Sequence, residues 1–283
     1  MNLDERGRQE VAGIPVYVKR PPRDPVGLTF VLTAANVPFS NYHSIRDALL
    51  ELDHVVVGYY INVVSPPLRN HRIKARDVYV MFEELRKEFT MITKYNIVGH
   101  SVGGKIALMV AALHNSDKSL QVVVALDPVD QNPVEFTNKN TKNNLSLTDT
   151  DVDIVMTFTD NGFFISKDHN ARAINQFYRN CEIVLHRNAA HMAYCDADGG
   201  LSWKNVILCG NRDRDAAVKE QALDLIKIRF EACIAKKAGR MADSFVKNIG
   251  DSINSSISDF NKDVAKATKM SDKRGIMQKL FNL

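Results

Sequence analysis

The stretch from Tyr95 to Leu113, YNIVGHSVGGKIALMVAAL, constrains the fold more than any other part of the sequence. A short apolar strand runs into the pentapeptide GHSVG, and an uninterrupted apolar helical stretch follows at once. This pattern predicts a strand, a sharp turn and a helix, with Ser101 at the apex. The strained backbone of such a serine is tolerable because Gly99 and Gly103 carry no side chain where strand and helix crowd together. We therefore expect an exposed Ser101 hydroxyl, with the backbone amide of Val102 aimed at the group that the hydroxyl attacks.

The same residues admit a second interpretation. Gly99 to Lys105 matches the G-x-x-x-x-G-K pattern of a phosphate-binding loop, and the apolar strand from Val122 to Asp127 ends in Asp, as it does in proteins with that loop. However, the loop needs Ser or Thr after the lysine to hold magnesium, and Ile106 cannot ligate a cation. Two strand-helix units also precede the loop, which normally follows an early strand. A P-loop-like NTPase is therefore only a minor alternative.

The order of the remaining segments predicts an α/β protein with a mostly parallel central sheet. Apolar, β-prone stretches alternate with helical patterns along the chain, so helices should cover both faces of the sheet. We expect strands over residues 11–19, 27–34, 54–64, 95–98, 120–126, 152–159 and 182–186, and helices over residues 40–52, 75–89, 102–113 and 170–180. The first of these strands should lie at an edge. The Asn- and Thr-rich segment over 131–151 should be an irregular surface excursion, and a plain solvated loop is the first expectation for it. With the loop over 64–73 it can also shape a substrate pocket.

Composition and charge narrow the class of protein. A chain of 283 residues with 45% apolar content can bury one full core plus an appendage, which we place at residues 1–239 and 240–283. The net charge of +4 arises in the last segment, because Lys236 to Leu283 carries ten Lys or Arg against five Asp. The body is thus nearly neutral and shows no nucleic-acid footprint. The charged start and the lack of a long apolar run predict an intracellular, cytoplasmic protein.

Serine chemistry near neutral pH requires a base, and the base requires an acid that fixes its tautomer. In α/β-hydrolases these residues follow the chain order Ser, then Asp or Glu, then His. Ser101 comes first here, and His191 follows the last predicted strand, whereas His100, beside the nucleophile, should point its ring elsewhere. Two acids lie between them, Asp127 and Asp160, each at the end of a strand. Position alone does not choose between the two.

A resemblance to a known family favours one of them. The sequence is similar to chlorophyllases over roughly Leu28 to Ala235, in the segments GHSVGGKIAL, ALDPVD, NQFYRNC, EIVLH, AAHM and ILCGN. Chlorophyllases are α/β-hydrolases that cleave the phytyl ester of chlorophyll. In that family the elbow serine, the aspartate of the D-P-V stretch and the histidine before Met form the triad. The resemblance therefore implies a carboxyl-ester hydrolase that uses Ser101, Asp127 and His191 and requires no metal or organic cofactor.

The departures from the family lie around the oxyanion hole. Val102 stands where the family usually has Arg, and Thr33-Ala34 stands where it has His-Gly. Because an oxyanion hole uses backbone amides, Val102 and Ala35 can still supply both donors. The altered loop is the best support for a different class of function, a catalytically silent scaffold of the same fold that binds apolar ligands or partners.

The C-terminal segment and the cysteines complete the predictions. Apolar residues from Met241 to Val264 recur every three or four positions between polar ones, which predicts an amphipathic helix. Such a helix could pack on its own domain, pair with a second copy or lie on a lipid surface. No two cysteines form a C-x-x-C pair, so we do not expect a zinc site. Four cysteines allow three disulfide pairings, and free thiols are the default inside a cell; the cysteines are Cys181, Cys195, Cys209 and Cys233.

Overall fold

The computed structural model describes residues 7–62, 70–114, 118–137, 145, 147, 151–160, 169–177, 181–187, 189–196, 216–235 and 262. In this part of the chain, eight strands form one sheet in the order β1-β2-β4-β3-β5-β6-β7-β8. The strands are β1 (Arg8–Val11), β2 (Ile14–Lys19), β3 (Gly27–Leu32), β4 (His54–Tyr59), β5 (Tyr95–His100), β6 (Leu120–Leu126), β7 (Asp153–Thr159) and β8 (Glu182–His186). All neighbours from β4 to β8 in this order pair in parallel, whereas β2 pairs antiparallel with both β1 and β4. The predicted mostly parallel sheet is confirmed.

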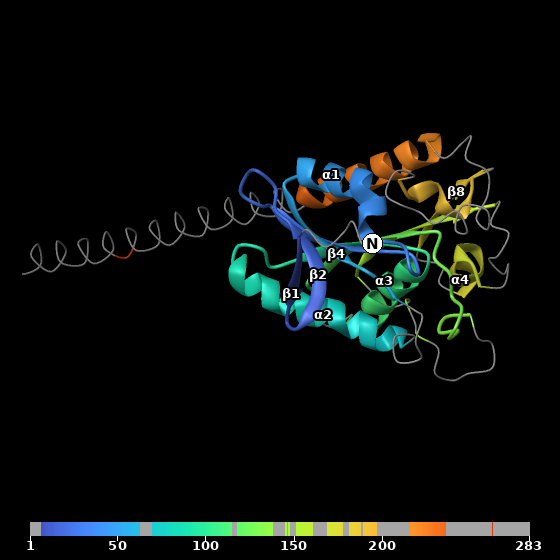
Figure 1. The fold of residues 1–283 in the computed structure, drawn as a ribbon, viewed down its shortest axis with the longest axis horizontal. Helices are drawn as coiled ribbons and strands as arrows, with labels where there is room; N and C mark the ends of the chain where they lie inside the picture. Colours follow the sequence, from blue (N-terminus) through green and yellow to red (C-terminus); the bar gives the residue numbers. More distant parts are fainter. Residues whose placement is uncertain are drawn as a thin grey trace, which may run out of the picture. The chain divides into compact units, whose positions relative to one another are not determined.

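Helices lie on both faces of the sheet (Figure 1). They are α1 (His43–Glu51), α2 (His71–Glu88), α3 (Val102–Leu113), α4 (Ala171–Phe177) and a helix over residues 216–235, with short 3-10 helices η1 (Phe39–Tyr42) and η4 (His191–Tyr194). In Figure 1, α1 and the orange helix over 216–235 lie above the sheet, and α2 and α3 lie below it. Every residue of β3, β4 and β5 is buried, as expected for central strands covered on both faces.

The N-terminal region differs from the single edge strand predicted over 11–19. The structure has a hairpin, in which β1 is the edge strand and β2 pairs with both β1 and β4. The reason lies in the two-residue turn between the strands. Ala12 has a φ of 52° and Gly13 a φ of 75°, the left-handed pair of angles that matches the twist of a hairpin. The sequence Ala-Gly is a weak version of the Asn-Gly signal for this turn.

The register of the sheet brings the ends of the central strands together. Leu32 of β3 is the Cα partner of Gly99, and His100 of β5 is the partner of Leu126 of β6. Because parallel strands share one carboxyl edge, Ser101 and Asp127 are the first residues beyond neighbouring strands. This edge is where ligands bind in open α/β sheets.

The chain divides into two compact units, residues 1–231 and 232–283. Of the second unit only residues 232–235 and 262 belong to the described part. The predicted amphipathic helix, apart from Lys262, therefore lies outside it, and the boundary proposed at residue 239 stays a prediction. Within the described ranges, every helix is too short or too polar to cross a membrane.

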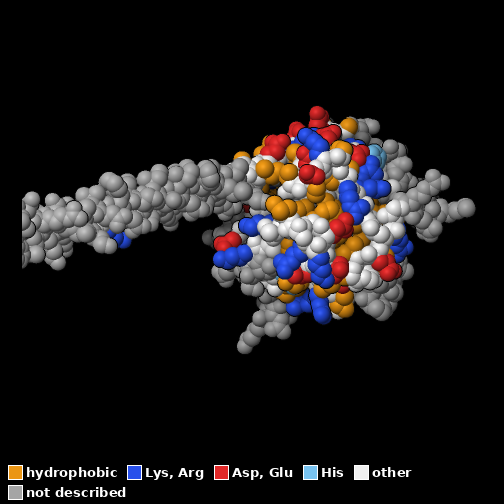
Figure 2. Space-filling view, turned by 90° about the vertical axis from the view of Figure 1, so that its left-hand side faces the viewer, with side chains coloured by type: hydrophobic (Ala, Val, Ile, Leu, Met, Phe, Trp, Pro, Cys, Tyr) orange, Lys and Arg blue, Asp and Glu red, His pale blue; other side chains and the backbone are white. Residues whose placement is uncertain are grey.

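The charges on the surface are mixed. Figure 2 shows Lys and Arg interspersed with Asp and Glu over the face in view, rather than a patch of one sign.

Candidate active site

Ser101 occupies the strained turn that the sequence predicts between β5 and α3. Its φ of 57° and ψ of −118° lie outside the helical and extended regions, a conformation that costs a few kcal/mol and must be held by its surroundings. Its N–H donates to the carbonyl of Leu126 at 2.9 Å, and its carbonyl accepts from the N–H of Val129 at 3.2 Å. Both partners belong to β6 or to the loop after it, so the neighbouring strand fixes the turn.

The two glycines of the elbow are needed for packing. A Cβ on Gly99 would lie 2.4 Å from the carbonyl oxygen of Gly103, and a Cβ on Gly103 would lie 2.3 Å from the carbonyl oxygen of Leu32. Both contacts are with backbone atoms, which cannot swing away. The close approach of β3, β5 and α3 at this point therefore requires glycine at both positions, as the sequence predicts.

The structure brings Ser101, His191 and Asp127 into one hydrogen-bonded series. Nε2 of His191 lies 2.8 Å from the Ser101 hydroxyl oxygen, and Nδ1 of His191 lies 2.7 Å from Oδ2 of Asp127. Since a carboxylate only accepts, Nδ1 carries the proton of the neutral ring and Nε2 is left to accept from the serine hydroxyl. This geometry suits removal of the serine proton during attack on a carbonyl carbon.

Asp127 is held in place by the neighbouring strand. It is fully buried, its N–H donates to the Thr157 hydroxyl at 2.9 Å, and its carboxylate accepts from both the N–H and the hydroxyl of Thr159. Thr157 and Thr159 alternate along β7 and so lie on the same face of the sheet. The carboxylate thus keeps two donors besides His191, which fix its direction.

The rival acid and the rival histidine occupy other surroundings. Asp160 is exposed at the end of β7, and the carboxylate that contacts His191 is that of Asp127. His100 is buried, and its ring nitrogens face the Tyr42 hydroxyl and the backbone carbonyl of His191 rather than Ser101. Burial and the nearby His191 ring lower the pKa of His100 well below its usual value, so this ring is neutral near pH 7.

The two predicted oxyanion donors lie beside Ser101 in the sequence and after β3. Val102 begins α3, where the first amides of a helix have no intrahelical acceptor. Ala35 follows Ala34, whose N–H donates to the Tyr42 hydroxyl at 2.8 Å. Neither the Ala35 nor the Val102 N–H is a donor in the backbone hydrogen bonds of the described loops and turns, and both residues are partly exposed.

The segment after His191 is anchored at Asp196. The carboxylate of this buried residue accepts from the N–H and hydroxyl of Ser44 at 2.8 and 2.5 Å and from the Lys219 ammonium at 2.8 Å. Burial alone would raise the pKa of Asp196, but the hydrogen bonds from Lys219 and Ser44 outweigh it and hold that pKa below its usual value. The loop that carries the histidine is thereby tied to α1 and to the helix over 216–235.

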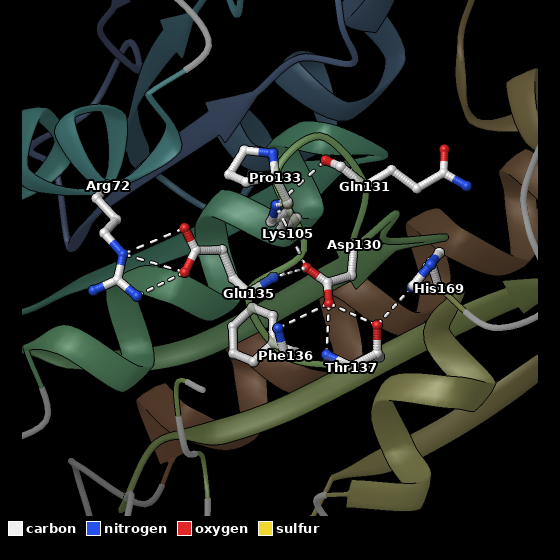
Figure 3. A network of polar contacts seen from close by, with 9 residues as sticks. All are labelled: Arg72, Lys105, Asp130, Gln131, Pro133, Glu135, Phe136, Thr137 and His169. Carbon is white, nitrogen blue, oxygen red and sulfur yellow. Dashed lines mark hydrogen bonds and ion pairs between the residues drawn. The ribbon is translucent and has the colours of Figure 1, made fainter. Parts of the chain in front are cut away.

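Lys105, the lysine of the phosphate-loop interpretation, is buried in a separate polar network (Figure 3). Its ammonium lies 3.4 Å from Oδ1 of Asp130 and donates to the backbone carbonyls of Gln131 and Pro133. Ile106, at the position where such a loop needs a hydroxyl, is fully buried. The lysine is thus engaged in holding the loop after β6 against α3, an arrangement that does not favour the NTPase interpretation.

Asp130 organises the rest of this network. Its carboxylate accepts from the backbone N–H groups of Glu135, Phe136 and Thr137 at 2.7–2.8 Å, and the Thr137 hydroxyl also contacts His169 at 2.7 Å (Figure 3). This network fixes the first part of the segment predicted to be irregular over 131–151. Most of the remainder of that segment, and most of the loop over 64–73, lies outside the described residues.

The sequence did not single out several residues that surround Ser101, His191 and Asp127. Two alternating threonines in a buried strand were an available signal for Thr157 and Thr159. Tyr42, by contrast, lies in an ordinary helical pattern.

The described cysteines, Cys181, Cys195 and Cys233, are thiols, and burial raises the pKa of Cys181 to about 11. Cys209 lies outside the described part of the chain. Among the described residues no cluster of His, Cys, Asp or Glu could hold a metal ion.

Comparison with known proteins identifies the architecture. No protein-family model and no curated protein matches the sequence. Among solved structures, Est1E from Butyrivibrio proteoclasticus is similar to this chain with a TM-score of 0.55 and 12% identity, over 80% of this chain and 99% of that one. A carboxylesterase structure from Nitrososphaera gargenis has a TM-score of 0.52 and 11% identity, over 79% and 96%.

A third solved structure is the 2-hydroxy-6-oxo-6-phenylhexa-2,4-dienoate hydrolase from a Rhodococcus strain, with a TM-score of 0.50 and 13% identity, over 68% of this chain and 93% of that one. At such identities the likeness establishes the fold rather than the substrate. The parallel sheet, the helices on both faces and these structural neighbours lead to one conclusion: the chain has the α/β-hydrolase fold.

Proposed function

We propose that this protein is a serine carboxyl-ester hydrolase in which Ser101 is the nucleophile, His191 the general base and Asp127 the acid that orients it. The observation that carries the proposal is the continuous series from the Ser101 hydroxyl through the His191 ring to the Asp127 carboxylate, with contacts of 2.8 and 2.7 Å. Carboxylesterases among the solved structures of the same fold support the reaction class.

The reaction proceeds by acyl transfer. His191 takes the hydroxyl proton as Ser101 attacks the ester carbonyl, and the resulting oxyanion accepts hydrogen bonds from the amides of Ala35 and Val102. The protonated His191 then gives its proton to the departing alcohol, which leaves an acyl-serine. Water, deprotonated by the same histidine, releases the carboxylic acid and restores the serine.

The substrate we propose is an apolar ester, with the phytyl ester of chlorophyll as the specific candidate. The support for chlorophyll is the resemblance to chlorophyllases in the segments around Ser101, Asp127 and His191. The support for a carboxyl ester in general is broader, because it rests on the geometry of the three side chains. The two levels of the proposal therefore need separate tests.

The first test replaces the nucleophile. Ser101→Ala should abolish labelling by a fluorophosphonate and lower the turnover of short-chain p-nitrophenyl esters by at least about 10⁴-fold, because the other groups act through the serine oxygen. Ser119→Ala is the matched control, since Ser119 is equally buried but precedes β6 at the opposite edge of the sheet. Unchanged labelling of Ser101→Ala would refute the assignment. A folded wild type that neither labels nor turns over any ester would instead indicate a silent scaffold.

The second test addresses the substrate. A panel of esters, from short acyl esters to chlorophyll, should be measured with the Ser101→Ala protein as blank. We expect chlorophyll to be hydrolysed with a higher kcat/KM than the short esters. Turnover of short esters without turnover of chlorophyll would retain the hydrolase and remove the chlorophyll proposal.

A further inference from the structure

A buried series of hydrogen bonds runs from the loop after β3 to the loop that carries His191. It begins at the N–H of Ala34, which lies 2.8 Å from the Tyr42 hydroxyl oxygen. That hydroxyl lies 2.9 Å from Nδ1 of His100, and Nε2 of His100 lies 2.8 Å from the backbone carbonyl of His191. Two side chains thus connect two loops that are more than 150 residues apart in the sequence.

The His191 carbonyl and the Ala34 amide determine the direction of every hydrogen bond in this series. The carbonyl of His191 only accepts, so Nε2 of His100 carries the proton and Nδ1 of the neutral ring accepts. The Tyr42 hydroxyl must then donate to Nδ1, which leaves its oxygen to accept from the Ala34 amide. The donor and the acceptor of each hydrogen bond in the series are thus assigned. Replacing Tyr42 or His100 removes two of these hydrogen bonds.

Burial keeps the Tyr42 and His100 side chains neutral, as this series of hydrogen bonds requires. Tyr42 and His100 are each only 1% exposed. Burial raises the pKa of Tyr42 well above its usual value, and burial lowers the pKa of His100 well below its own. Both groups are therefore neutral around pH 7. The rings also pack against each other, with centroids 5.9 Å apart.

The two ends of this hydrogen-bonded series lie next to the proposed oxyanion donor and at the proposed base, which must be aligned for acyl transfer. Ala34 immediately precedes Ala35, a proposed oxyanion donor, and His191 is the proposed base. We propose that Tyr42 and His100 are positioning residues, which hold the Ala34-Ala35 loop and the His191 loop at a fixed separation on either side of Ser101. This inference rests on the proposed function.

Other roles for these residues fit less well. His100 does not serve as a second base, because its Nε2 is occupied by a carbonyl and its Nδ1 by a hydroxyl. Sγ of Cys195 also lies 3.6 Å from Nδ1, so the thiol is a weak second donor at that nitrogen. Loss of the Tyr42 hydroxyl would leave the ring with this donor, but would leave the Ala34 amide without its acceptor.

The test uses kcat and KM for a short-chain p-nitrophenyl ester and the rate of fluorophosphonate labelling. Tyr42→Phe should lower kcat and the labelling rate roughly 10- to 100-fold and leave KM within about twofold, because oxyanion contacts strengthen mainly in the transition state. Tyr95→Phe is the matched control: Tyr95 is a fully buried tyrosine at the other end of β5, and its loss should leave kcat unchanged.

His100 offers a graded series. His100→Leu removes both contacts. In His100→Asn the amide oxygen takes the place of Nδ1 and can accept from Tyr42, and in His100→Gln the amide nitrogen reaches the place of Nε2 and can donate to the His191 carbonyl. We expect kcat to fall in all three, with the Asn and Gln proteins each retaining more activity than the Leu protein. A purely structural role would change the melting temperature without this order in kcat of the folded fraction.

The outcomes separate this inference from the proposed function. A wild type that labels and turns over ester, together with a Tyr42→Phe protein that does so at the same rate, would overturn the positioning role alone. Parallel changes in KM and kcat, or a Leu protein as active as the Asn and Gln proteins, would overturn it as well. A folded wild type that neither labels nor hydrolyses would overturn both proposals together.

Discussion

At Ser101 the backbone has a φ of 57°, a value that few residues other than glycine adopt. The conformation is held by main-chain hydrogen bonds to Leu126 and Val129 and by the absence of side chains at Gly99 and Gly103. The next residue, Val102, opens helix α3, whose first amides have no intrahelical acceptor. At this scale the proposed chemistry depends on where the Ser101, His191 and Asp127 side chains lie, and other residues hold them there.

The choice between Asp127 and Asp160 also belongs to the residue scale. Asp127→Asn should lower kcat by roughly 10³- to 10⁴-fold, because an amide in place of the carboxylate stabilises the wrong tautomer of His191. Asp160→Asn, at an exposed position, should leave kcat within a few fold. The measurement is steady-state turnover of a p-nitrophenyl ester by both proteins. A larger loss in Asp160→Asn would show that the acid comes from the end of β7.

Between elements, the buried pair of Lys105 in α3 and Asp130 after β6 holds the start of the segment that follows the sheet edge. Neither side chain is exposed, and burial lowers the pKa of Lys105 although Asp130 partly opposes this. Taking a charge out of water is costly unless its partner is present. The pair therefore favours one conformation of the loop, because any conformation that buries one charge without the other has a higher free energy.

Removing one partner should expose this cost. Lys105→Met should lower the free energy of unfolding by about 2 to 4 kcal/mol, because it leaves the Asp130 carboxylate buried without its cation. The double variant Lys105→Met/Asp130→Asn should lose less than the sum of the single losses. Urea unfolding measures both. Lys87→Met, which breaks an exposed pair with Glu84, is the control and should stay close to wild type. Equal losses in the two lysine variants would contradict the argument.

For the whole molecule, we expect acid to lower the stability, and buried His54 should contribute to this effect. His54 of β4 contacts the Thr29 hydroxyl at 2.7 Å and stacks on Phe230 of the helix over 216–235. Burial lowers the pKa of His54 to about 4. Since an unfolded histidine has a pKa of about 6.5, the unfolded chain takes up a proton between pH 6.5 and 4 that the folded one does not, and stability falls as pH decreases through that range.

His54→Gln removes this titration. From pH 7 to pH 5 the variant should lose about 1 to 2 kcal/mol less stability than the wild type, whatever its stability at pH 7. Urea unfolding at the two pH values gives the difference. His114→Gln, at a partly exposed histidine, should follow the wild type more closely. If His54→Gln lost as much unfolding free energy between pH 7 and pH 5 as the wild type, His54 would have an ordinary pKa in the folded state.

The sequence by itself determined the parts of this protein that depend on neighbours along the chain. The strand-turn-helix around Ser101, the buried parallel strands and the mostly parallel sheet all follow from local spacing of glycine and apolar residues. The hairpin at Ala12-Gly13 was missed because its turn signal is weak. The order Ser101, Asp127, His191 was also readable from the sequence, but Asp160 remained a rival until a family resemblance was considered.

Only the tertiary structure decided which side chains meet at the edge of the sheet. The register that sets His100 beside Leu126 places Asp127 next to Ser101, and the alternation along β7 turns Thr157 and Thr159 toward it. Tyr42 and His100 join two distant loops that no local pattern relates. The physical reason is that spacing along the chain fixes secondary structure over a few residues, whereas contacts across strands depend on how the whole sheet packs.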